Sequence, residues 1–90
     1  MDRSVGGAAN ERLGAQLKGL RLRAGLTQRV VAERLGERQA FVSEYEHGRR
    51  RLDVLELRAI ARALGRPAVA VVAQLDALDA VLAALGDDAS

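Results

Sequence analysis

The residues from Thr27 to Arg51 constrain the fold of this chain more than any other part. They read TQRVVAERLGERQAFVSEYEHGRRR, which is typical of two short helices joined by a glycine turn and followed by three arginines. Ala32, Gly36 and Val42 lie where two steeply crossing helices need a small side chain, a left-handed backbone and a buried aliphatic side chain. We therefore expect the second helix of this pair to project from the body of the protein.

Apolar spacing and capping residues predict three further helices, and the fold class is all-α, a compact bundle of five helices. The third helix is expected over residues 38–47 and the fifth from Pro67 to about Leu85. The expected capping and stop residues are Asn10, Gly25, Thr27, Gly36, Gly48, Asp53 with Glu56, and Gly65. The expected inward side chains are Leu13, Leu17, Leu20, Ala24, Val31, Ala32, Leu35, Val42, Tyr45, Leu57, Ile60, Ala61 and Leu64.

Four segments follow from this pattern. Residues 1–9 are small and aperiodic, which predicts a flexible tail. Residues 10–66 form the main helical domain, residues 67–86 a C-terminal helix, and residues 87–90 an acidic tail.

Charge is distributed unevenly along the chain. All 14 Lys and Arg residues lie between Arg3 and Arg66, together with seven acids, whereas residues 67–90 hold four aspartates and no base. A basic body with an acidic end indicates a polyanionic partner for the body alone, although a merely solvated charged surface would have the same composition.

Several classes of function lack the residues that they need. The chain has no cysteine, one histidine (His47) and no glycine-rich phosphate loop, so we expect no enzyme activity, no metal site and no cofactor. The longest uninterrupted apolar run, residues 67–73, is shorter than the ~20 residues that cross a bilayer, and we expect no membrane partner.

The chain resembles the Cro and phage-repressor type of helix-turn-helix regulators over roughly Leu13 to Gly65. The resemblance rests on LGAQLKGLRLRAGLTQ, VAERLG, RQAFVSEYEHG and LELRAIARALG in this order and spacing. It implies a helix-turn-helix domain over residues 10–66 that binds double-stranded DNA with its second short helix, the recognition helix.

The resemblance also implies individual roles. Gln28, at the start of the first short helix, would contact a phosphate, because its amide and the free backbone amides there suit an anion. The outward face of the recognition helix would comprise Gln39, Ala40, Ser43 and Glu44. Gln39 is the best candidate for reading a base, since its amide can both accept from and donate to adenine, and Ala40 could meet a thymine methyl group.

Two acids depart from the family pattern. Glu44 stands where a basic or amide residue is usual, and its carboxylate would repel phosphates or accept from a cytosine amino group. Glu37 occupies a turn position that is often aliphatic. Phe41 could pack on the loop before the fourth helix or touch the DNA.

Basic residues flank the recognition helix on both sides. Arg49, Arg50 and Arg51 follow it directly and are expected to clamp phosphates or probe a minor groove, and Arg38 is a further phosphate candidate. In the resembling family, a glutamate at the position of Glu46 pairs with an arginine at the position of Arg21, which implies a buried structural ion pair here.

The fifth helix carries a heptad-like apolar seam, consisting of Val71, Leu75, Leu78, Leu82 and Leu85. Such a seam could pack back on its own domain, but apolar residues on neighbouring faces favour a second copy, and we expect a homodimer.

We expect a sequence-specific transcriptional regulator, a repressor, that binds an inverted repeat as a homodimer. It would be a cytoplasmic, nucleoid-associated protein of bacterial or phage origin. A controller of a restriction–modification operon or an antitoxin fits the same residues. A protein-interaction module that has lost DNA binding, with an unknown protein partner, is an alternative that Glu37 and Glu44 support.

Overall fold

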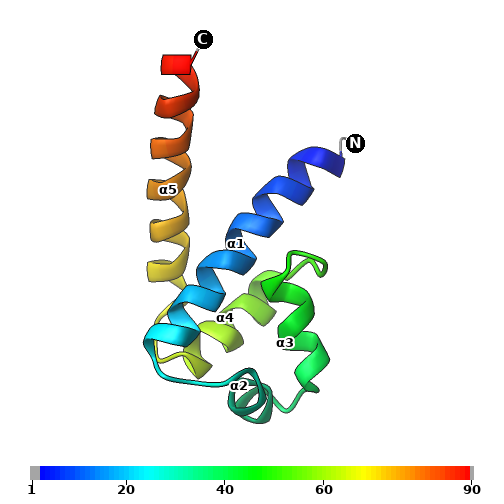
Figure 1. Cartoon of the computed structure of the whole chain (residues 1–90). Coiled ribbons are helices and arrows are strands. Elements are labelled where there is room, and N and C mark those ends of the chain that lie inside the picture. The colour runs from blue at the N-terminus through cyan, green and yellow to red at the C-terminus, as the bar shows by residue number, and fades with distance from the viewer. Residues whose placement is uncertain (1–2, 90) are drawn as a thin grey trace.

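The computed structural model describes residues 3–89 of the chain, and the side chains of residues 7–86. Five helices and no strand make up this range (Figure 1): α1 (Arg3–Arg23), α2 (Gln28–Leu35), α3 (Gln39–Glu46), α4 (Val54–Ala63) and α5 (Ala68–Ala89). The all-α, five-helix fold that the sequence predicts is confirmed.

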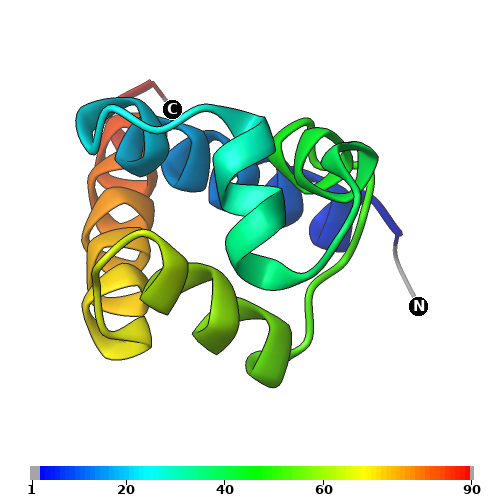
Figure 2. The ribbon, with the colours of Figure 1, turned by 90° about the horizontal axis from the view of Figure 1, so that it is seen from below.

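The helices form a small bundle from which α5 and the first half of α1 extend. Helix α1 packs on α3, α2 packs on both α3 and α4, and α4 packs on α5. Seen from the front and from below, α3 and α5 lie on opposite sides of the molecule (Figures 1 and 2). The two short helices are therefore accessible from a side that α5 does not cover.

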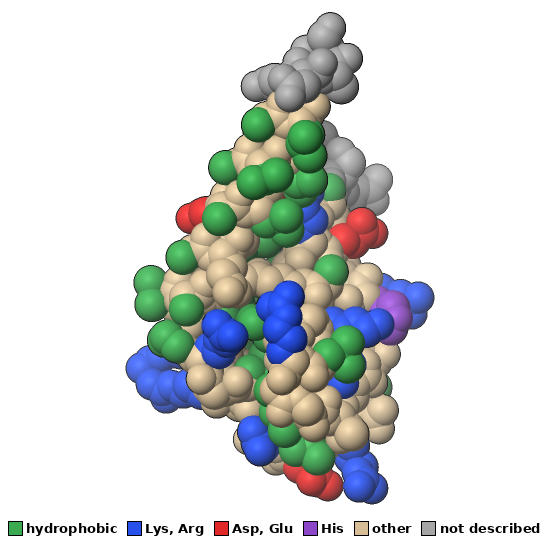
Figure 3. Space-filling view, turned by 60° about the vertical axis from the view of Figure 1, so that its left-hand side comes forward, with side chains coloured by type: hydrophobic (Ala, Val, Ile, Leu, Met, Phe, Trp, Pro, Cys, Tyr) green, Lys and Arg blue, Asp and Glu red, His purple; other side chains and the backbone are tan. Residues whose placement is uncertain are grey.

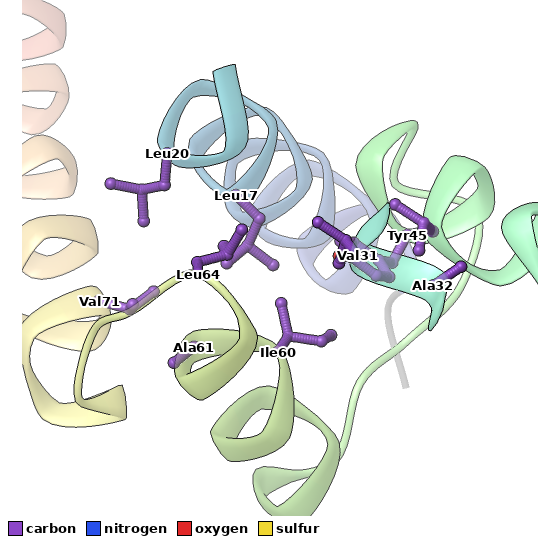
Figure 4. Close-up of a cluster of buried hydrophobic side chains, with 10 residues drawn as sticks. Leu17, Leu20, Val31, Ala32, Tyr45, Ile60, Ala61, Leu64 and Val71 are labelled. Atoms are coloured by element: carbon purple, nitrogen blue, oxygen red, sulfur yellow. The ribbon is translucent and has the colours of Figure 1, made fainter. Parts of the chain in front are cut away.

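One apolar core holds this arrangement together (Figure 4). Every helix contributes to it, and its buried members are Leu17, Leu20, Val31, Ala32, Val42, Tyr45, Ile60, Ala61, Leu64 and Val71. Burying each large aliphatic side chain stabilises the fold by about 1.5–3 kcal/mol. The inward faces predicted from apolar spacing are thus largely correct, except that Ala24 lies beyond the end of α1 and is exposed.

Local chemistry sets the ends of the short helices. The Thr27 hydroxyl accepts a hydrogen bond from the backbone amide of Val30 at 3.1 Å and caps α2. Gly36 ends α2 with a φ of 68°, a left-handed conformation that glycine adopts without strain. Asp53 and Glu56 form the expected reciprocal capping box at the start of α4.

The start of the first helix differs from the sequence-based expectation. Helix α1 already begins at Arg3, so the flexible tail over residues 1–9 is wrong for residues 3–9, and Met1 and Asp2 lie outside the described residues. Asn10 does not cap a helix; its side chain donates to two carbonyl oxygens of the loop after α3. This long-range contact gives the asparagine a role within the helix that local propensity does not reveal.

The fifth helix also departs from expectation, at its C-terminal end and at Val71. It continues to Ala89, through residues 87–89 that were predicted as a tail, and Ser90 lies outside the described residues. Val71, the first residue of the predicted dimer seam, is fully buried in the core of its own protomer. It is therefore not available to a partner, because α4 and α1 already cover it.

Apolar side chains cover much of the rest of α5 (Figure 3). The stretch Ala68–Gly86 has a mean hydropathy of 1.9 and only 6% of it is buried, so by length and composition alone it could span a membrane. The length of the uninterrupted apolar run does not reveal this property, since Gln74, Asp76 and Asp79 break the run without greatly lowering its average hydropathy.

Candidate nucleic-acid interface

Helices α2 and α3 meet at a tight turn. The Gly36 amide donates to the Ala32 and Glu33 carbonyls, and the Glu37 amide donates to the Ala32 carbonyl at 2.9 Å. Ala32 and Val42 are buried where the two helices pack on the core, as their positions in the sequence predicted. This packing directs the opposite side of α3 outward.

The outward side of α3 carries the residues that were expected to face DNA. Gln39, Ala40 and Glu44 are exposed and Ser43 is partly exposed, whereas Val42, Tyr45 and Glu46 on the other side are buried. Within the described residues, this face is thus open to a large ligand.

A chain of polar contacts connects this face to the interior. The guanidinium of Arg21 donates to the carboxylate of Glu46 from Nε at 2.6 Å and from Nη2 at 3.1 Å. The Gln28 amide donates to Glu46 Oε1 at 2.9 Å, and the Gln39 amide donates to Gln28 Oε1 at 3.2 Å. Gln39 is therefore oriented by a glutamine that is itself oriented by a buried ion pair.

The ion pair expected between Arg21 and Glu46 is present and buried. The side chains are 9% and 1% exposed, and Arg21 also donates from Nη1 to the Leu26 carbonyl at 2.9 Å. The hydrogen bond to Glu46 raises the pKa of Arg21 further above its already high value. The pair joins α1 to the end of α3, so it sets the position of the exposed helix.

The middle one of the three arginines after α3 contacts other parts of its own protein. The Arg50 guanidinium lies 4.8 Å from the centroid of the Phe41 ring, and its Nη2 donates to Glu56 Oε2 at 2.8 Å. This side chain therefore packs on its own protein in this structure while remaining exposed to solvent. Arg49 and Arg51 are exposed, as is Arg38 at the start of α3.

A family model for the helix-turn-helix matches residues 17–70, more than half of the chain. The chain belongs to the Cro-type helix-turn-helix family of DNA-binding transcriptional regulators. The resemblance that the sequence motifs indicated is thus confirmed. Members of this family are typically not enzymes.

Solved structures agree with this assignment. The clp gene regulator ClgR from Corynebacterium glutamicum is 32% identical with a TM-score of 0.79, covering 90% of this chain and 86% of ClgR. An XRE-family like protein from Pseudomonas syringae is 37% identical, with a TM-score of 0.76 and coverages of 84% and 93%. The restriction-modification controller C.AhdI from Aeromonas hydrophila is 26% identical, with a TM-score of 0.68 and coverages of 71% and 97%. No curated protein sequence matches the chain.

This helix-turn-helix regulator has a hollow at the start of α2, which was not predicted from the sequence. It is open, has a volume of about 550 Å³, and is lined by Arg21, Leu22, Gly25, Leu26, Thr27, Gln28, Arg29 and Gln39. Arg29 is exposed and was overlooked. Its position in the sequence was a signal for a functional role, because a cation in the first turn of a helix opposes the helix dipole and so does not stabilise the helix.

The acids that depart from the family pattern gather around Arg50. Glu37 and Glu44 are both exposed and lie near enough to Arg50 to raise its pKa, although the hydrogen bond to Glu56 contributes most. In this helix-turn-helix protein their charge is therefore partly balanced by Arg50. Phe41 packs edge-on against Tyr45, with ring centroids 5.4 Å apart, and faces the loop before α4, which resolves the two readings of this residue in favour of packing.

The single histidine has a structural contact. His47 Nδ1 lies 2.8 Å from the Ser43 carbonyl oxygen at the end of α3, as expected for a histidine at a helix terminus. Among the described residues of this regulator, no group of three or more His, Cys, Asp or Glu side chains could hold a metal ion.

Proposed function

We propose that this regulator binds an inverted-repeat operator as a homodimer and represses transcription there. The observation that carries the proposal is the exposed face of α3, on which Gln39 is oriented by Gln28 and the buried ion pair behind it. A side chain that is already ordered loses little entropy when it binds a base.

Gln39 is the proposed reader of an adenine. One N–H of its amide contacts Gln28, which leaves its second N–H and its carbonyl oxygen available. These two groups match the acceptor and donor that adenine presents in the major groove. Ala40 would meet a thymine methyl group, Ser43 a base or phosphate, and Glu44 a cytosine amino group.

The backbone contacts would come from both sides of α3. Gln28 and Arg29 line the hollow at the start of α2, where backbone amides and positive charge favour a phosphate. Arg38, Arg49 and Arg51 are exposed around α3 and would contact further phosphates. Each such contact adds to the dependence of affinity on salt.

Dimerisation is proposed to use the part of the α5 seam beyond the core. Leu78, Leu82 and Leu85 are 41%, 43% and 59% exposed, and Leu75 is partly buried. We propose a second copy rather than a lipid bilayer as the cover, because α5 is tied to the domain by the buried Val71 and by a 2.8 Å ion pair between Arg12 and Asp79. Two recognition helices about 34 Å apart would then read half-sites one helical turn apart.

A restriction–modification controller is the second candidate function, and the similarity to C.AhdI favours it. It differs from the first in the operator that is bound and not in the mode of binding. Either activity would be exerted in the cytoplasm, where the DNA lies.

Selection of duplexes from a random pool tests the proposal. We expect enrichment of an inverted repeat with half-sites one turn apart, and loss of preference at one position in each half-site for Gln39→Ala. Gln74→Ala is the matched control, because it removes a glutamine amide from α5, on the opposite side of the molecule. No retention of DNA at low salt would contradict the proposal and favour a protein-interaction module.

A further inference from the structure

We propose that Asn10 is a positioning residue for DNA binding, which holds the loop of residues 48–52 so that Arg49 and Arg51 face the phosphates. The inference rests on the proposed function. Asn10 lies on α1 and is 38 residues away in sequence from the nearer of the two groups that it contacts.

Both contacts are hydrogen bonds to the loop backbone. Asn10 Nδ2 donates to the Gly48 carbonyl oxygen at 3.0 Å and to the Arg50 carbonyl oxygen at 3.0 Å. The two N–H groups of one amide thus bridge the residues on either side of Arg49. Such a bridge restricts the backbone dihedral angles of Arg49 itself.

The loop also lies directly on α1 at Gly48. This glycine has a φ of 73°, and a Cβ atom placed on it would be 2.7 Å from Glu11 Cγ and 2.8 Å from Glu11 Cα. The approach is too close for any side chain, and the neighbouring Asn10 is therefore within reach of the loop carbonyls.

The central arginine provides a second attachment. Arg50 is held between the Phe41 ring and the Glu56 carboxylate, while the Arg49 amide donates to the Glu44 carbonyl at 2.9 Å. The loop is consequently fixed to α1, α3 and α4, and all three arginines are exposed, of which Arg50 is held by its contacts with Phe41 and Glu56. Arg50 acts with Asn10 as an anchor, and Arg49 and Arg51 are the contacts.

Fixing the loop in advance matters because a flexible loop must be ordered when it meets DNA. Ordering a single backbone residue reduces binding by about tenfold, which is the scale of the effect that we expect from losing the Asn10 bridge. The charge of the protein would be unchanged by this loss.

The test compares Asn10→Ala in two backgrounds. In the otherwise unchanged protein we expect about tenfold weaker binding to the selected duplex and a shallower dependence of affinity on salt, because fewer phosphates are engaged. In a background with Arg49→Gln and Arg51→Gln, we expect Asn10→Ala to have no further effect. The base preference should stay the same in every variant, since Gln39 is untouched.

A measurement on the free protein supplements the binding data. Alanine is the best helix former, so Asn10→Ala should fold, and we expect faster hydrogen exchange of the loop amides with unchanged exchange in the core. Equal loss of affinity in both backgrounds, or no loss in either, would overturn the inference. Failure of the unsubstituted protein to bind any duplex would instead refute the proposed function.

Discussion

Arg21 and Glu46 form a buried, two-pronged ion pair that joins the last turn of α1 to the last turn of α3. Glu46 also accepts from Gln28, so one carboxylate organises both the scaffold and the polar contacts that lead to Gln39. The stability of the fold and the orientation of the proposed base reader therefore depend on the same pair.

Removing one partner of this pair should destabilise the protein strongly. We expect Glu46→Ala to lower the free energy of unfolding by about 3–5 kcal/mol, because the guanidinium of Arg21 is left buried without its counter-ion. The double variant Arg21→Met with Glu46→Leu should lower the free energy of unfolding by much less. Urea denaturation monitored by circular dichroism measures both, and equal losses for the single and double variants would contradict this account.

Close packing of α1 on α3 predicts a difference between two glycines of the same helix. A Cβ atom on Gly14 would lie 2.8 Å from the Glu46 carbonyl oxygen and closer still to that of Tyr45, whereas a Cβ on Gly19 would meet nothing within 4 Å. Gly14→Ala should destabilise by about 1–3 kcal/mol or more, and Gly19→Ala should stabilise by about 0.5–1 kcal/mol. Thermal denaturation of the two variants distinguishes them, and similar shifts in both would show that the approach at Gly14 is relaxed in solution.

Burial of Tyr45 predicts a loss of stability in alkaline solution. Burial raises the pKa of Tyr45 above the usual value of about 10, so the unfolded chain releases this proton first. The stability contributed by the protonated Tyr45 hydroxyl is fully present below pH ~10. It is lost as the pH rises from there towards the pKa of Tyr45 in the folded protein, at up to about 1.4 kcal/mol per pH unit. Between pH 8 and 11, the free energy of unfolding should fall less steeply with pH for Tyr45→Phe than for the unsubstituted protein. Identical slopes would exclude this cause.

The contact between Gln28 and Gln39 predicts that the two side chains act as a unit. Gln39→Ala should reduce discrimination at one base pair by about 1–3 kcal/mol. Gln28→Ala should weaken the same discrimination, because Gln39 loses the acceptor that orients it. In a double-mutant cycle of duplex binding, the loss of discrimination in the double variant should be smaller than the sum of the losses in the two single variants. Full additivity would argue against positioning by Gln28.

A matched pair of charge substitutions tests the proposed dimer interface on the exposed part of α5. Leu82→Asp places a charge on the apolar seam, and Ala80→Asp places the same charge on the opposite face of the helix, where the residue is exposed. We expect Leu82→Asp alone to convert the dimer to a monomer in light scattering. A monomeric unsubstituted protein, or equal effects of the two variants, would contradict the proposed interface.

Local signals in the sequence predicted most of the fold. The Thr27 cap, the Gly36 turn and the Asp53–Glu56 capping box each involve residues within four positions of one another, so their chemistry is complete in a short segment. The inward faces of the short helices follow from apolar spacing for the same reason. The family resemblance added the pairing of Arg21 with Glu46, which spacing alone does not reveal.

Residues close in sequence thus determined where the short helices α2, α3 and α4 begin and end and which way their apolar sides face, since those choices depend on neighbours within about one helical turn. Tertiary structure decided the rest: Asn10 became a bridge to a loop instead of a helix cap, Arg50 packed against Phe41 and Glu56, and Val71 entered the core. Each of these outcomes depends on groups of different helices that meet only after the helices have packed, and apolar spacing and capping signals do not include such contacts.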